Sequence, residues 1–255
     1  MDRYRLRRII QKVRAFIKYG YFEFPEWMLA LFSKAERMKL LNVFHQMGIR
    51  EAEKYFILDP RSDPYPFLET FILKMYGYCD YKDKTIIDVG AQTGDSVLYF
   101  SYCGARKIYA FEPLIDNFRI LENNVYMNKI NCDCYNVGLG NFTGSIKVEN
   151  SSRMARPLTR GSSENEIIKI SRLDEYNIIA DVLKIDVEGF EMEVLKGGLN
   201  TVKTAMIVIV ETHSKELQVE VARFLLGLGF RRKRKIQNYI AKNVRVEYWL
   251  RQDGH

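Results

Sequence analysis

The spacing of apolar residues divides the chain into two parts. Before about residue 80, apolar positions recur every three or four residues, which is the period of an amphipathic helix. The first such run is Leu6, Ile9, Ile10, Val13, Phe16 and Ile17. Beyond that point, short apolar runs typical of buried strands alternate with longer helical stretches. We therefore predict a helical N-terminal region over residues 1–80 and an α/β domain over residues 81–255.

The order of elements in the second part predicts a mostly parallel sheet. Strands are expected at residues 84–91, 107–113, 131–140, 181–189 and 205–213. Helices are expected at residues 96–102, 116–129, 190–202 and 215–230, and an antiparallel pair at residues 232–243 and 244–252. Such alternation gives a doubly wound sheet with helices on both faces. Two stretches are expected to be irregular, a connection at residues 58–67 before one more helix at 67–78, and a polar loop at 149–166.

The stretch Ile86–Phe100, IIDVGAQTGDSVLYF, places a tight turn with two glycines between the first strand and the first helix of this domain. Such a turn is often an ordinary connection, but ligands of doubly wound sheets bind at the carboxyl ends of strands. Glu112 ends the next strand, where a carboxylate accepts hydrogen bonds from a ribose. A dinucleotide fingerprint would need glycine where Gln92 and Asp95 stand, and no GxxxxGK[ST] loop occurs. The pattern favours a nucleoside cofactor without phosphate groups.

Six motifs in one order give the chain a family resemblance. They are DVGAQTG, AFEP, LENNVYMN, NVGLGNFTG, LKIDVEGFEMEVLKG and IVIVETH, and they cover residues 85–213. With them the sequence resembles the FkbM family of S-adenosylmethionine-dependent methyltransferases. The resemblance implies a Rossmann-like, seven-stranded class I methyltransferase sheet with S-adenosyl-L-methionine as cofactor. It also implies a cofactor site with a methionine-side turn, a ribose carboxylate and an adenine side, made of Asp88, Gly90, Ala91, Gln92, Thr93, Gly94, Glu112, Pro113, Gly138 and Leu139.

Two pairs of titratable residues end strands that should be neighbours in this fold. Asp186 and Glu188 share one face by strand alternation, and so do Glu211 and His213. Methyl transfer to a hydroxyl needs a group that takes a proton, so Asp186, Glu211 and His213 are the candidate catalytic residues. The same three are possible ligands of a divalent metal that would orient the acceptor. Glu188 and Glu191 equally suit the start of the next helix, where acidic residues complement the helix dipole.

Positive charge is concentrated at two places in a chain of formal net charge +7. Residues 1–18 carry seven Lys or Arg against one Asp, and RRKRK spans residues 231–235. The first cluster lies on the predicted N-terminal helix, which either packs on the main domain or contacts a membrane surface. The second is expected on a solvated strand, with nucleic acid as a less favoured partner. No apolar run suits a membrane span or a signal peptide, so we expect a cytoplasmic protein.

The resemblance implies an O-methyltransferase that acts on a hydroxyl of a sugar, a glycan or a small natural product. The polar loop at residues 149–166, with Arg153, Arg156 and Arg160, would close over the acceptor or else remain a mobile insertion. Two other functions stay open. An RNA methyltransferase would use the basic N-terminal helix and residues 231–235 to follow phosphates. A non-catalytic nucleoside-binding scaffold would use the cofactor turn without turnover.

Overall fold

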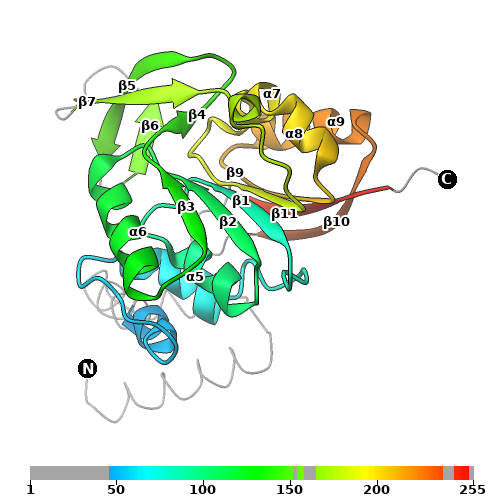
Figure 1. Cartoon of the computed structure of the whole chain (residues 1–255). Coiled ribbons are helices and arrows are strands. Elements are labelled where there is room, and N and C mark those ends of the chain that lie inside the picture. The colour runs from blue at the N-terminus through cyan, green and yellow to red at the C-terminus, as the bar shows by residue number, and fades with distance from the viewer. Residues whose placement is uncertain (1–45, 152–153, 158–164, 238–243, 253–255) are drawn as a thin grey trace, which may run out of the picture.

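The computed structural model (Figure 1) describes residues 46–151, 154–157, 165–237 and 244–252. The basic N-terminal helix and its expected contacts lie outside the described residues, as do Arg153 and Arg160 of the expected lid. Among the described residues, none of the helices has the length and apolar character that crossing a bilayer requires.

A seven-stranded sheet forms the centre of the molecule, in the order β10-β11-β9-β8-β1-β2-β3. The strands from β9 to β3 run parallel, and β10 and β11 are antiparallel, which confirms the predicted sheet and its final hairpin. Strand order reverses at β1, because β2 and β8 lie on opposite sides of it. The strands are β1 (Thr85–Val89), β2 (Lys107–Phe111), β3 (Cys132–Tyr135), β8 (Val182–Ile185), β9 (Ile207–Thr212), β10 (Phe230–Gln237) and β11 (Arg245–Arg251).

Helices cover both faces of this sheet (Figure 1). One face carries α5 (Asp95–Tyr102) and α6 (Ile115–Met127), and the other carries α7 (Glu191–Gly197), α8 (Leu199–Thr204) and α9 (Lys215–Gly227). Strand alternation divides the apolar residues of the sheet between two cores. In β1, for example, Ile86 belongs to the core with α5 and Ile87 to the core with α7. The helix predicted at residues 190–202 breaks into α7 and α8 at Gly198.

A second sheet of four strands, which the sequence did not predict, lies beside the first. Its order is β4 (Gly138–Leu139), β7 (Asn165–Ser171), β5 (Gly144–Ser151) and β6 (Met154–Pro157). The strand predicted at residues 131–140 is therefore two strands in different sheets, because the chain leaves the main sheet after Tyr135. The loop predicted at residues 149–166 is also corrected, because β5 and β6 extend into it as an antiparallel pair. A 3-10 turn, η2 (Leu173–Tyr176), follows β7.

Residues 46–80 pack against the face of the sheet that carries α5. Phe67 and Phe71 are buried in one apolar cluster with Val97 of α5. The helix predicted at residues 67–78 starts earlier and is shorter, because α4 (Pro64–Phe67), capped by Asp63, continues as the π-helix η1 (Leu68–Ile72). Proline suits the first helical position, where its missing N–H has no partner to lose. Part of the connection predicted at residues 58–67 is thus helical, and the domain boundary at residue 80 stays a prediction.

Candidate functional site

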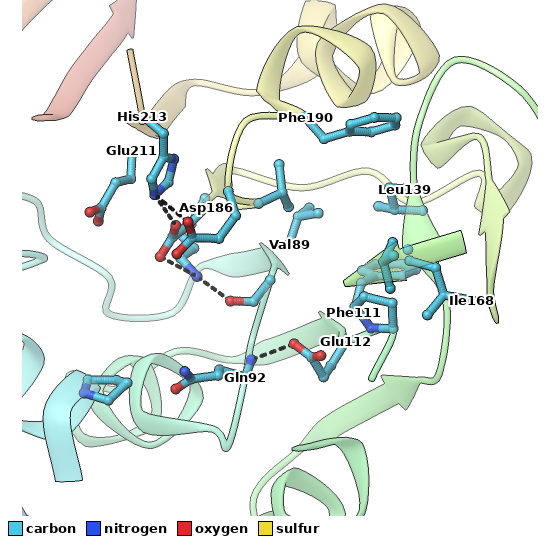
Figure 2. Close-up of a pocket in the computed structure, with 18 of the residues that line it drawn as sticks. Val89, Gln92, Phe111, Glu112, Leu139, Ile168, Asp186, Phe190, Glu211 and His213 are labelled. Carbon is cyan, nitrogen blue, oxygen red and sulfur yellow. Dashed lines mark hydrogen bonds and ion pairs between the residues drawn. The ribbon is translucent and has the colours of Figure 1, made fainter. Parts of the chain in front are cut away.

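A pocket opens at the carboxyl ends of β1, β2, β8 and β9, where the reversal of strand order predicts a ligand site. Figure 2 shows Asp186 and His213 at one end of this pocket and the apolar Leu139 and Ile168 at the other. Glu112 lies between these two ends. The pocket lining also includes residues of α4 and η1, from the N-terminal side of the chain, and residues of the second sheet.

The turn after β1 packs directly against the loop after β8. Gly90 has a φ of +79°, and a Cβ at this position would lie 1.8 Å from the carbonyl oxygen of Asp186. The N–H groups of Gly90 and Ala91 donate to the carbonyl oxygen of Phe111, at 2.9 and 3.1 Å. Only glycine fits here, because two backbones meet without room for a side chain. The first glycine of the turn therefore fixes the floor of the pocket.

Lys184 is a buried cation beside Gly90, and the sequence analysis did not identify it. The residue is 2% exposed, and its ammonium group lies 2.9 Å from Asp88 Oδ1 and donates to the carbonyl oxygen of Gly90 at 2.8 Å. Burial by itself lowers the pKa of Lys184, but the charges of Asp88 and Asp186 outweigh burial and hold this pKa above its ordinary value. A lone lysine within an otherwise apolar strand was the available signal.

Glu112 directly follows β2, and its carboxylate is turned toward backbone N–H groups. Oε2 accepts from Gln92 at 3.0 Å, a bond drawn in Figure 2, and Oε1 accepts from Leu114 at 2.9 Å. The residue is 4% exposed, and burial raises the pKa of Glu112 to about 7 although both bonds lower it. A carboxylate oxygen can accept more than one hydrogen bond, so Glu112 retains capacity for hydroxyl groups of a ligand.

The ten residues predicted to bind the cofactor fall into two groups. The first group is buried beneath the pocket surface and consists of Asp88, Ala91, Thr93 and Gly94. Asp88 pairs with Lys184, and Gly94 precedes α5 with a φ of +93°. These four shape the turn from behind. Contact with a cofactor stays a prediction for all ten. The pocket itself is lined by Gly90, Gln92, Glu112, Pro113, Gly138 and Leu139.

The second sheet closes the apolar end of the pocket. Its inward residues form one cluster with Leu114 and line the pocket together with Leu139. In β7 the buried Ile168 and Ile170 alternate with the exposed Ile167, which is the pattern of a strand with one covered face. The sequence analysis missed this wall, because the polar residues around it hid a short alternation. The inward residues are Ile146, Val148, Ile168 and Ile170.

The three candidate catalytic residues come together at the other end of the pocket. Asp186, Glu211 and His213 each offer one ligand atom, and these atoms lie within 4.8 Å of one another. His213 Nε2 lies 3.7 Å from Asp186 Oδ1 and 3.7 Å from Glu188 Oε2. The expected strand alternation is not the cause, because β8 ends at Ile185. A turn in which Glu188 has a φ of +53° brings both acidic residues to the histidine instead.

Glu191 bonds the imidazole ring of His213 through Nδ1, the ring nitrogen that does not face Asp186 and Glu188. Its carboxylate is fully buried, and Oε1 lies 2.6 Å from His213 Nδ1 and accepts from the Gly189 N–H at 3.0 Å. Burial lowers the pKa of His213, but the Glu191 bond and the charge of Asp186 raise it to about 10. The helix-start role considered for Glu191 is therefore only part of what this residue does.

Residues of α4 and η1 complete the pocket beside this cluster. Tyr65 and Glu69 line it, and the Tyr65 hydroxyl donates to Glu69 Oε1 at 2.9 Å. Burial, together with the charges of Asp186 and Glu69, holds the pKa of Glu211 well above its usual range. No spacing in the sequence links residue 69 with residue 211, so only the tertiary structure reveals this carboxylate neighbour.

The pocket fits S-adenosyl-L-methionine on chemical grounds. Gln92 Oε1 is buried in the wall and has no hydrogen-bond partner among the described residues, so it suits an ammonium donor. Glu112 can accept from ribose hydroxyls, and the apolar end, with Leu139 and Ile168, suits the adenine ring. The acidic end suits the positive charge of the sulfonium. Each part of the cofactor thus has matching groups in the pocket.

Comparison with known proteins identifies relatives. Residues 88–232 match the model of the methyltransferase FkbM domain. Hexuronic acid methyltransferase AglP of Haloferax volcanii is 31% identical over 151 residues, which are 56% of this chain and 62% of that protein. The match thus spans less than two thirds of that relative's length.

Comparison with solved structures gives matches that include the following two. A ribosomal protein L11 methylase from Lactobacillus delbrueckii subsp. bulgaricus has a TM-score of 0.50 at 13% identity, over 76% of this chain and 84% of the other. A putative RNA methyltransferase from Pyrococcus horikoshii has a TM-score of 0.48 at 14% identity, over 75% and 85% of the two chains. The methylase with the higher score has the same fold as this chain.

Proposed function

Because the chain belongs to the FkbM family of S-adenosylmethionine-dependent methyltransferases, we propose that it transfers a methyl group to a hydroxyl oxygen of a sugar. The cluster of Asp186, Glu211 and His213 in the pocket carries this proposal. The hydroxyl oxygen would bond the methyl carbon as the methyl–sulfur bond breaks and the sulfur leaves as a neutral thioether. The hydroxyl also loses its proton, and this cluster offers groups that can receive it. AglP, named for hexuronic acid, supports a sugar as the acceptor.

The residues of this chain divide the work between binding and proton transfer. S-Adenosyl-L-methionine supplies an electrophilic methyl group that an oxygen attacks in line, which demands close positioning of the acceptor. Gln92 and Glu112 bind the polar parts of the cofactor, and the wall formed by β5 and β7 shields its apolar part from water. Asp186, whose side chain is 28% exposed, faces the acceptor and receives the proton. His213, with a pKa of about 10, is protonated at neutral pH and stabilises the carboxylates around it.

Charge favours a hydroxyl over a carboxylate as the acceptor group. The described lining holds two cationic side chains, Lys184 and His213, and Lys184 already pairs with Asp88. With the protein groups alone, a carboxylate acceptor would therefore enter an acidic pocket against like charge, and it would need no base. A neutral hydroxyl meets no such repulsion and makes use of the base. The acidic residues of the lining are Glu69, Asp95, Glu112, Asp186, Glu188 and Glu211.

The test is a transfer assay with methyl-labelled cofactor and three acceptor classes: neutral glycans, glycans that contain uronic acids, and RNA. Mild alkali then separates the products, because a methyl ester releases its label and a methyl ether keeps it. We expect alkali-stable label in a glycan, lost in Asp186→Asn. Alkali-labile label would contradict the hydroxyl assignment, and label in RNA would favour the exposed Arg231–Lys235 edge as a phosphate contact. Cofactor binding without transfer to any acceptor would favour a scaffold.

A further inference from the structure

We propose that Asp186, Glu211 and His213 bind a divalent cation with a preference for oxygen ligands, such as Mn²⁺ or Mg²⁺. The end of the pocket where these three residues lie is called the acceptor end. Their three ligand atoms lie within 4.8 Å of one another. Ligand atoms on opposite sides of Mg²⁺ stand about 4 Å apart, at twice the metal–oxygen distance, and adjacent ones stand about 3 Å apart. The three side chains therefore have to close by roughly 1–2 Å to enclose such an ion. Only the catalytic consequence of this site rests on the proposed function.

Two rigid strands position the carboxylate ligands. Glu211 lies within β9 and is 8% exposed, so the packed sheet fixes its backbone and most of its side chain. Asp186 follows β8 directly, and its N–H donates to the carbonyl oxygen of Val89 at 3.0 Å. The parallel pairing of β8 with β9 sets these two positions side by side. Sites on such elements hold their ligands with little loss of freedom on binding.

The third ligand is oriented by a residue outside the cluster. Metal-bound histidines almost always bond a carboxylate or carbonyl through their second ring nitrogen. Glu191, fully buried at the start of α7, makes this bond to His213 Nδ1 at 2.6 Å. Nε2 is thereby left toward Asp186, where an ion would take the place of its proton. A buried carboxylate in this role is an independent indication of a metal site.

The chemistry of the surroundings selects the class of ion. Glu69 and Glu188 also line this end, and Lys184 is committed to Asp88 and Gly90. A divalent cation would offset this excess of negative charge. Two carboxylates and one imidazole, with no cysteine in the described lining, suit Mn²⁺ or Mg²⁺ better than thiolate-seeking ions. Three protein ligands leave positions open for two neighbouring hydroxyls of a sugar, one of which would be made more acidic.

The experiment measures Mn²⁺ binding to the full chain, after chelator treatment, from the loss of the free-ion signal in electron paramagnetic resonance. We expect one ion per wild-type chain. Glu211→Gln should weaken its affinity at least tenfold, because loss of even an outer-shell partner of a metal ligand costs about 10- to 100-fold. The matched control is Glu69→Gln, which removes one charge from the same pocket end without removing one of the three ligand atoms, and it should change the affinity less than threefold. Cofactor binding checks that each variant is folded. If Glu211→Gln is not folded, His213→Ala is measured in its place.

Four results test this proposal and separate it from the proposed function. Failure of the wild type to bind Mn²⁺ saturably at millimolar concentration overturns the metal site. Equal weakening by Glu211→Gln and Glu69→Gln also overturns it, because the effect would then be general electrostatics. Methyl transfer at an undiminished rate in excess chelator removes the catalytic role and leaves the transferase standing. Stoichiometric Mn²⁺ binding without transfer to any sugar keeps the metal site and refutes the acceptor assignment.

Discussion

The two ends of the pocket are built in different ways. The cofactor end comprises the apolar end and the adjoining turn after β1. Its polar residues Gly90, Gln92 and Glu112 belong to one continuous strand–turn–helix–strand unit, and a hydrogen bond joins the second to the third. At the acceptor end, Glu69 and Glu211 come from segments far apart in the sequence, η1 and β9, and they line the same pocket only because the chain folds these segments together. Local sequence therefore defines the polar residues of the cofactor end, whereas tertiary contacts define the acceptor end. We expect the first to control binding and the second to control turnover.

The substitution with the largest expected effect is Gly90→Ala, which disrupts the packing of the turn after β1 against the loop after β8. Its Cβ would lie 1.8 Å from the Asp186 carbonyl oxygen, so β1 and β8 must separate there. We expect the melting temperature to fall by more than about 10 °C, which at 2–4 °C per kcal/mol corresponds to roughly 3 kcal/mol or more. The matched control is Gly189→Ala, where φ is +106° and nothing lies within 4 Å. That variant should lose only about 1–2 kcal/mol of stability, because of the backbone strain of a side chain at positive φ. Equal losses of stability in the two variants would contradict the close contact at Gly90.

Asp186→Asn tests whether the acceptor end controls turnover. The amide keeps the shape of the side chain and removes the proton acceptor, so kcat should fall by roughly 10²–10⁴, the range for general-base catalysis. Calorimetry should find the Kd for S-adenosyl-L-methionine changed less than about threefold. Asp116→Asn, at a side chain 80% exposed on α6, is the matched control and should leave both constants unchanged. A large rise in Kd with normal kcat would move Asp186 to the cofactor end.

Glu191→Gln is a smaller change at the same end, because it acts through His213. We expect kcat to fall about 10- to 100-fold, as for other residues that orient a histidine from behind. Cofactor affinity should stay near the wild-type value, and the melting temperature should fall because a buried charged pair loses one partner. A purely structural role would leave the kcat of the folded variant unchanged. Glu193→Gln, two residues further along α7 and paired with Lys196 on the surface, is the control and should have wild-type kcat. A loss of stability with normal kcat would make Glu191 a structural residue.

The smallest effect is a pH dependence at the cofactor end. The pKa of Glu112 is raised by burial to about 7, and its ionised form is the better acceptor for ribose hydroxyls. Affinity for S-adenosyl-L-methionine should therefore rise about tenfold between pH 6 and pH 8, as the carboxylate ionises. Asp95 lines the same pocket with a pKa of about 6 and is largely ionised by pH 7. Glu112→Gln should abolish the rise measured above pH 7, and its persistence in that variant would exclude Glu112 as the cause.

Sequence reasoning succeeded where the signal was periodic and failed where it was short or non-local. Strong apolar runs located β1, β2, β8 and β9, because central strands of a parallel sheet are buried on both faces. The second sheet was missed because its strands lie in a polar stretch and one of them, β4, follows β3 almost directly. Glu191 was interpreted as a helix-start residue, since nothing nearby in the sequence indicates that His213 is its partner.

The sequence by itself determined the doubly wound sheet, the family and the turn that holds the cofactor end, because each is expressed in residues that are close together in the chain. Only the tertiary structure decided which groups face one another across the pocket. The pairs Lys184 with Asp88 and Glu191 with His213 join different elements, and the carboxylates Glu69 and Glu211 line the same pocket. Hydrogen bonds and charges act over a few ångströms in space, whatever the separation of their residues along the chain.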